Sequence, residues 1–208
     1  MVLADNGTAI NAIYAQISKT LAIIQRPTIM TTTNSENKNT IHHEYGNFLI
    51  EFEKLVLSIR INIMILFSSN GLKERKYLRI VLQDQTAYPL NNKLRSLYGV
   101  YYENSPEKLK LIEKLFIYTN SLIEKRNFIV HGSTFVVDHE SSDLLKDKIG
   151  KFGVESEEEN LTVESLSNLT SKIKIAKDKF EYLTLCLFEP DRDLNKCFSE
   201  EKLKMIKL

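Results

Sequence analysis

The sequence has few cysteines, no long apolar run and no signal-peptide pattern, and each absence narrows the class of protein. Its two cysteines, Cys186 and Cys197, are not spaced as a metal-ligand pair, which suits a reducing compartment. The most apolar run, residues 59–67, contains Arg60 and Asn62 and is too short to span a bilayer. The first residues carry an acidic side chain where a signal peptide has positive charge. We therefore expect a cytoplasmic protein that does not enter the membrane.

Strong net charge and Gly-rich phosphate loops are also missing. The formal net charge is +1, so no overall field attracts nucleic acid, and any RNA binding must come from a local patch. His42 and His43 form a doublet with no other ligand at a metal-like spacing, and the aspartates show no paired-carboxylate arrangement. We therefore expect neither a metal site nor a cofactor.

What the sequence does have is material for one helical domain over residues 1–208. Its 208 residues are 43% hydrophobic and 26% charged, which is enough for a sizeable core. Apolar residues recur at helical spacing, which predicts an all-α, up-and-down bundle of four to six helices. We expect an N-terminal helix over residues 1–26, a loop over 27–44 and the bundle with a central long helix over 45–131. A hairpin or loop insertion should follow over 132–160, then a last long helix over 161–189 and a charged tail over 190–208.

Prolines and capping residues give the helix boundaries. Between the N-terminal helix and the central helix we expect three helices, over residues 45–67, 72–83 and 91–102, the last of them preceded by Pro89. After the central helix, the pattern changes. We expect a short β-hairpin from residues 134–137 and 148–154, an acidic loop over 155–159, and a last helix that Thr162 caps.

The central helix is expected from Ser105 to Gly132. Ser105 can cap it, Pro106 suits the first helical position, and Glu107 suits the positive end of the helix dipole. Gly132 suits a left-handed C-terminal cap. The helix has apolar residues along most of its length, which predicts that it is largely buried: Leu109, Ile112, Leu115, Phe116, Leu122, Ile123, Ile129 and Val130.

One row of this helix is polar. Asn120, Glu124, Asn127 and His131 are spaced four, three and four apart, which places them on one face. Solvent exposure would explain such a row, and so would a functional site. For His131 alone, a role at the helix C-terminus, where a cation is favoured, is a further alternative.

The end of the helix resembles a known family. Residues 126–131, Arg-Asn-Phe-Ile-Val-His, are similar to the signature of HEPN domains, in which an Arg is followed by four to six residues and a His. The resemblance covers these residues and a helical frame over residues 45–188. It implies a HEPN-like helical bundle, commonly dimeric. Many members are metal-independent ribonucleases of toxin–antitoxin, abortive-infection or CRISPR-linked defence systems.

RNA cleavage without a metal needs a base, an acid and a cation. His131 can serve as base or acid, and Arg126 can bind phosphate oxygens as the cation. Asn127 could orient the imidazole or the phosphate, and Glu124 could hold Arg126 or His131 in place. Arg126 and His131 are five positions apart, about 140° around an ideal helix, so they do not project side by side on it. By resemblance, a dimer would bring two motifs into one cleft, and the products would be a 2′,3′-cyclic phosphate and a 5′-hydroxyl.

Further basic residues are candidates for RNA binding: Arg60, Lys93, Arg95 and Lys125. Arg60 could share a cleft with the motif, or its side chain could reach to the surface. Lys93 and Arg95 precede three tyrosines, Tyr98, Tyr101 and Tyr102. Such interleaving could track a phosphate backbone and stack bases, but the charges could equally form a solvated face over core tyrosines.

Two classes of function remain open. The first is a HEPN endoribonuclease, a toxin or antiviral-defence effector that cleaves RNA and dimerises through the motif helix. The second is a non-catalytic HEPN-like module that binds a partner, such as a nucleotidyltransferase antitoxin or a defence complex. A helical adaptor unrelated to HEPN is a more distant alternative.

Overall fold

The structure, a computed structural model, describes residues 40–71, 75–136, 141–150, 153–189 and 191–198. The helix expected over residues 1–26, most of the loop after it and the end of the tail lie outside these residues. Within the described residues no helix has both the length and the apolar character needed to cross a membrane.

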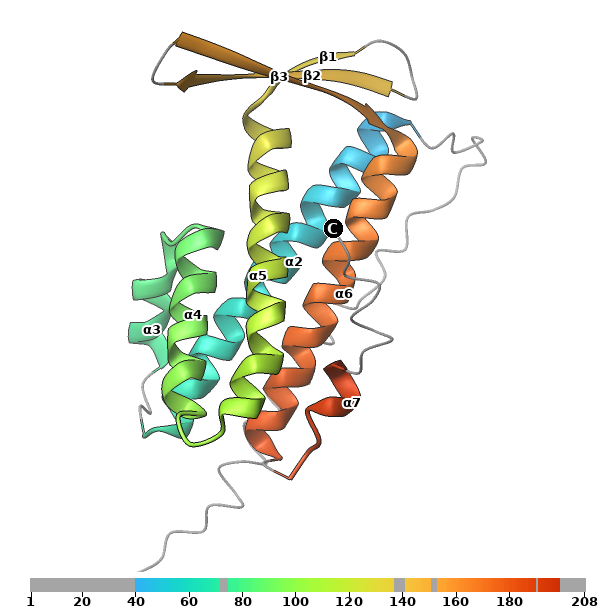
Figure 1. Ribbon diagram of the computed structural model, residues 1–208. Coiled ribbons are helices and arrows are strands. Elements are labelled where there is room, and N and C mark those ends of the chain that lie inside the picture. The colour runs from blue at the N-terminus through green and yellow to red at the C-terminus, as the bar shows by residue number, and fades with distance from the viewer. Residues whose placement is uncertain (1–39, 72–74, 137–140, 151–152, 190, 199–208) are drawn as a thin grey trace, which may run out of the picture. The chain divides into compact units, whose positions relative to one another are not determined.

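The described residues form mainly helices, which confirms the all-α class (Figure 1). Helix α2 packs against α4 and α6, and α5 also packs against α4 and α6. The helices are α2 (Ile41–Ser69), α3 (Arg75–Gln83), α4 (Ala87–Tyr101), α5 (Pro106–His131), α6 (Val163–Phe188) and the short α7 (Asn195–Phe198).

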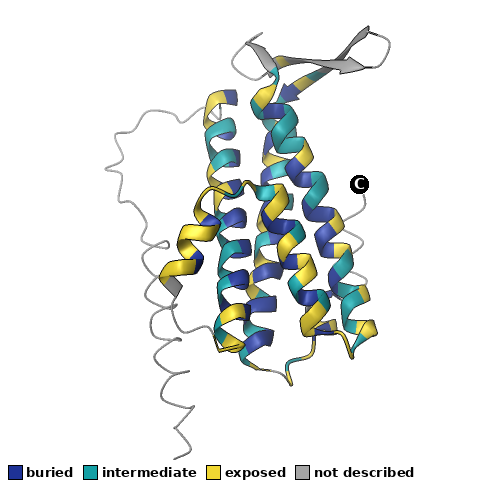
Figure 2. Ribbon diagram, turned by 90° about the vertical axis from the view of Figure 1, so that its left-hand side faces the viewer, coloured by how far each residue is buried: buried dark blue, intermediate teal, exposed yellow. Residues whose placement is uncertain are grey.

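The core lies between the four long helices. Phe116 of α5 and Phe180 of α6 are fully buried and their ring centroids are 5.8 Å apart. Burying one such side chain contributes about 1.5–3 kcal/mol to the free energy of unfolding. Figure 2 shows that α3, by contrast, is mostly exposed. The long helices contribute further fully buried residues: Phe48, Leu55, Ile59, Leu90, Leu94, Leu115, Ile173 and Leu183.

A buried polar contact joins three of these helices. The Tyr98 hydroxyl of α4 donates to Asn62 Oδ1 of α2 at 2.7 Å, and Asn62 Nδ2 donates to the Phe180 carbonyl of α6 at 3.0 Å. Burial raises the pKa of Tyr98 well above its usual value, so the phenol stays protonated and keeps donating. The polar side chains of Tyr98 and Asn62 are therefore hydrogen-bonded although they are buried.

Two helices begin earlier than the sequence predicted. Helix α4 starts at Ala87 and not at Asn91, so Pro89 lies inside its first turn. Proline is tolerated there because an amide in the first turn has no partner within the helix. Helix α2 starts at Ile41, and the Thr40 side chain caps it by accepting a hydrogen bond from the His43 amide at 3.3 Å.

Helix α5 has the expected length but not the expected C-terminal cap. It begins with Pro106 at its first position and ends at His131. Gly132 has φ −78° and ψ 154°, an extended conformation, so the predicted left-handed cap is wrong. The chain passes directly from Gly132 into a strand at Ser133, and an extended backbone makes that connection.

A three-stranded antiparallel sheet connects α5 to α6 (Figure 1). Its strands are β1 (Ser133–Val136), β2 (Ser141–Gly150) and β3 (Gly153–Thr162), in that order. The register pairs Gly150 with Gly153 at the β2–β3 turn. Residues 155–159, predicted as an acidic loop, are part of β3. Pairing with the long strand β2 decides their conformation, because strand formation depends on context more than on composition.

The start of α6 is fixed as the sequence predicted. Thr162 accepts a hydrogen bond from the Ser165 amide at 3.0 Å, and Ser165 Oγ accepts one from the Thr162 amide at 3.0 Å. This capping box satisfies two amides that the helix itself cannot bond.

Candidate functional site

Four residues singled out in the sequence line one cavity of about 310 Å³. Arg60 comes from α2, and Arg126, Asn127 and His131 come from the last turns of α5. The start of α4 and the turn before it complete the lining. We call this the arginine cavity.

The Arg126 guanidinium is held from two sides. Its Cζ lies 5.4 Å from the centroid of the Phe52 ring, a cation–π contact with α2. Its Nη1 donates to Asn127 Oδ1 at 3.3 Å, while its Nε is buried and has no acceptor among the described residues. The group is therefore fixed in place with hydrogen-bond donors to spare.

The Arg60 guanidinium reaches the same cavity from α2. Its Nη2 donates to the Gln85 carbonyl at 3.1 Å, and its Nε is buried without a described acceptor. The side chain therefore lines the cavity and remains partly exposed. Gln85 is held from its other end, because Lys93 Nζ donates to Gln85 Oε1 at 2.9 Å. Lys93 thus supports the rim and is not itself part of the lining.

Neither guanidinium forms an ion pair with a carboxylate of the described residues. A partly buried cation without a counter-ion is costly, and so is a buried N–H without an acceptor. An anion in the cavity would satisfy both groups at once. Arginine suits oxyanions such as phosphate because its planar donors match their geometry.

His131 is the last residue of α5 and lines the same cavity. Its side chain is exposed and makes no hydrogen bond or ion pair with any described residue. Arg126 and His131 both line this cavity, although they are about 140° apart around an ideal helix. The Arg126 side chain is long and partly buried, and His131 stands at the end of the helix. The imidazole nitrogens are open to a ligand.

The rest of the polar row divides between other surroundings. Asn120 accepts a hydrogen bond from Asn91 Nδ2 at 2.9 Å and lines a second cavity, described below. Glu124 is exposed and contacts neither Arg126 nor His131 among the described residues, so the predicted supporting contact is not formed. The four residues of the row therefore have different surroundings. Asn120 lines the second cavity, Asn127 and His131 line the arginine cavity, and Glu124 is exposed to solvent.

Two other basic candidates are already neutralised. Lys125 forms an ion pair with Glu159 of β3 and lies over the Phe128 ring, 5.3 Å from its centroid. Arg95 binds Glu113 of α5 through both Nε and Nη2. Neither Lys125 nor Arg95 lines the arginine cavity.

The tyrosines after Arg95 are mainly core residues. Tyr98 and Tyr102 are buried, and their rings are nearly parallel with centroids 5.9 Å apart. Burial also raises the pKa of Tyr102. These two rings therefore have no free face for a base, and the alternative of core tyrosines holds for them.

Several lining residues were not singled out in the sequence, among them Glu53, Gln85 and Tyr88. Glu53 lies seven positions before Arg60, two helical turns on the same face, and this spacing is a signal that could have found it. Gln85 and Tyr88 follow a turn between α3 and α4, and no local pattern connects that turn with the motif.

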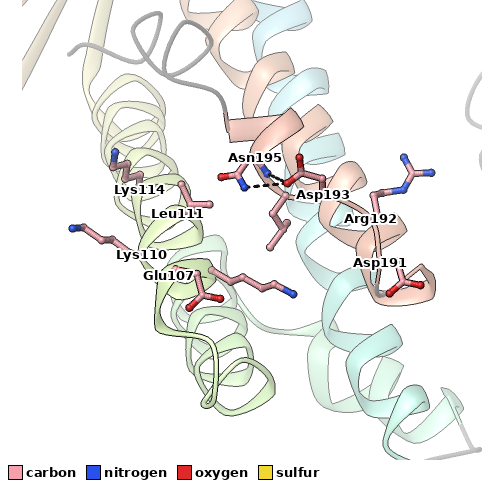
Figure 3. A pocket seen from close by; sticks show the side chains of 10 residues that line it. Glu107, Lys110, Leu111, Lys114, Asp191, Arg192, Asp193 and Asn195 are labelled. Atoms are coloured by element: carbon pink, nitrogen blue, oxygen red, sulfur yellow. Dashed lines mark hydrogen bonds between the residues drawn. The ribbon is translucent and has the colours of Figure 1, made fainter.

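A larger cavity, about 660 Å³, lies elsewhere (Figure 3). It is lined by the first turns of α5, including Lys110 and Lys114, and by residues 191–195 after α6. Asp193 Oδ1 accepts hydrogen bonds from both the backbone and the side-chain nitrogen of Asn195, at 2.9 and 3.0 Å. None of the motif residues belongs to this cavity.

No cluster of three or more potential metal ligands occurs among the described residues. Comparison of the chain with known protein families, with curated proteins and with solved structures finds no match.

Proposed function

We propose that this chain is a metal-independent endoribonuclease of the HEPN type, and that the arginine cavity holds the phosphate it cleaves. The observation that carries the proposal is the combination of two guanidiniums without carboxylate partners and one open imidazole in a single cavity. The sequence resemblance independently assigns Arg126 and His131 to the same chemistry.

Substrate binding begins with the phosphate. Arg126 and Arg60 approach the cavity from different helices, so together they can bind different oxygens of one phosphodiester. The Phe52 ring and the Gln85 carbonyl restrict the two side chains before substrate arrives. A preorganised positive site favours the extra negative charge of the phosphorane more than the charge of the ground state.

The chemical step is attack of a ribose 2′-oxygen on the adjacent phosphorus. A base removes the 2′-hydroxyl proton as the new P–O bond forms, and the P–O5′ bond breaks as an acid protonates the leaving 5′-oxygen. The products are a 2′,3′-cyclic phosphate and a 5′-hydroxyl, and no oxidant or other reactant is consumed.

Two proton carriers are needed, and the described lining offers an imidazole, that of His131, and a carboxyl group, that of Glu53. We assign His131 to one role and Glu53 to the other. A dimer through the motif helix, as the resemblance implies, would instead supply a second His131. The variant Glu53→Gln distinguishes these two cases. It should lose one limb of the pH–rate profile if Glu53 carries a proton, and it should keep both limbs if a second His131 does.

The biological role that fits this chemistry is that of a toxin or antiviral-defence effector acting on RNA in the cytoplasm. This part of the proposal rests on the resemblance of residues 126–131, and it includes a partner that restrains the nuclease, such as an antitoxin.

The test compares wild type with His131→Ala on a single-stranded RNA in excess chelator. His43→Ala is the matched control, because His43 is also an exposed helix-terminal histidine but lies outside the described cavities. We expect wild type and His43→Ala to release 2′,3′-cyclic phosphate ends, and His131→Ala to release none. Equal cleavage by all three, or no cleavage by any, would contradict the nuclease and favour the non-catalytic binding module.

A further inference from the structure

A second cavity, of about 510 Å³, shares one residue with the arginine cavity. Tyr88 lines both, and every other residue of the second lining comes from α4 or α5. Tyr88 stands in the first turn of α4, where that helix borders both cavities.

The Tyr88 ring is available in a way that the other α4 tyrosines are not. Its side chain is 47% exposed. It makes no hydrogen bond or ring contact with a described residue, whereas Tyr98, Tyr101 and Tyr102 contact one another. An exposed aromatic ring next to a phosphate site is the arrangement on which nucleic-acid bases stack.

The second cavity suits a base better than a phosphate. Its lining includes the apolar Phe116 and Ile112 and the amide residues Asn92 and Asn120. The one arginine of its lining is already paired with Glu113, so this cavity carries no uncompensated cation. Apolar side chains with a few amides match the faces and edges of a nucleobase.

We propose that the substrate is single-stranded RNA, and that a base next to the phosphate in the arginine cavity stacks on Tyr88 and enters the second cavity. This rests on the proposed function for the identity of the phosphate ligand. Only an unpaired nucleotide can turn its base out in this way, because bases within a duplex are stacked on their neighbours. Tyr88 is thus the residue that selects unpaired over paired RNA.

The test measures binding without cleavage, in the His131→Ala background. A short RNA with one 2-aminopurine is titrated as a single strand and within a hairpin stem, and both anisotropy and base fluorescence are followed. The variants are Tyr88→Ala, Tyr88→Phe and, as the control, Tyr77→Ala, which removes a ring that is 57% exposed on α3 and outside the described cavities. Thermal unfolding of each variant checks that the fold is retained.

We expect Tyr88→Ala to weaken single-strand binding by about 5- to 150-fold and to abolish quenching of the 2-aminopurine. Tyr88→Phe and Tyr77→Ala should bind and quench like the parent protein. Hairpin binding should be weaker and unaffected by Tyr88→Ala. Equal single-strand affinity of Tyr88→Ala and Tyr77→Ala would overturn the proposal. Equal affinity of the parent protein for the single strand and for the hairpin stem would overturn it as well.

The two proposals fail separately. If wild type cuts no RNA but single-strand binding still depends on Tyr88, the nuclease is wrong and the base site stands. If wild type cuts RNA and Tyr88→Ala cuts single strands and stems as wild type does, the nuclease stands and the base site is wrong.

Discussion

Two cavities along α5 differ in how their charges are accommodated. The larger one, at the start of the helix, has Lys110 and Lys114 exposed to water, and Arg192 is paired with Glu189. The smaller one, at the end of the helix, contains Arg60 and Arg126, each with a buried Nε that has no described acceptor. An exposed or paired cation needs no ligand, whereas a partly buried cation without an ion-pair partner favours one. The pairing state of the charges, and not the volume, is therefore our reason for proposing the smaller cavity as the site.

The largest effect should come from Arg126. We expect Arg126→Ala to lower the cleavage rate by about 100- to 1000-fold, because a donor aimed at developing charge is lost from a preorganised site. Single-turnover cleavage measures this, with Lys114→Ala as the control from the other cavity. Similar losses in both variants would remove the distinction between the two cavities.

Arg60 should contribute less, and mainly to binding. We expect Arg60→Ala to weaken RNA affinity by about tenfold and to make the slope of log affinity against log salt shallower by roughly one unit, as for the loss of one phosphate contact. Affinity across a salt series provides the measurement. An unchanged slope would mean that Arg60 does not meet a phosphate.

Stability should respond in the opposite direction to activity. Arg60→Met and Arg126→Met remove buried N–H groups that have no acceptor, so the free energy of unfolding should stay constant or rise by about 1 kcal/mol. Tyr98→Phe removes a satisfied hydrogen bond to Asn62 and should lower it by about 1 kcal/mol. Urea unfolding gives both values. Destabilisation by more than about 2 kcal/mol in either Met variant would indicate that the arginines serve the fold.

The smallest effect should come from the larger cavity itself. The double variant Lys110→Ala, Lys114→Ala should cleave and bind RNA within about twofold of wild type, since surface lysines far from the cleaved bond contribute only a screened field. A tenfold loss would show that RNA extends to the start of α5.

The sequence was sufficient to predict elements whose signals are local. Pro106, the apolar stripe of α5 and the Thr162 cap fixed two long helices, and the Arg-to-His spacing selected two residues of the cavity. It could not predict what depends on packing between distant segments. Glu53 and Tyr88 join the motif through tertiary structure, and the acidic residues 155–159 become a strand because β2 offers them a partner.

The most direct test of the central claim observes the arginines themselves. The chain has seven arginines, so their Nε–H signals can be assigned by NMR and followed while a 2′-O-methyl RNA, which cannot be cleaved, is added. We predict that the signals of Arg60 and Arg126 shift and become protected from exchange, while that of Arg192, which is paired with Glu189 and lines the larger cavity, stays in place. Unchanged Arg60 and Arg126 signals at saturating RNA would contradict the account.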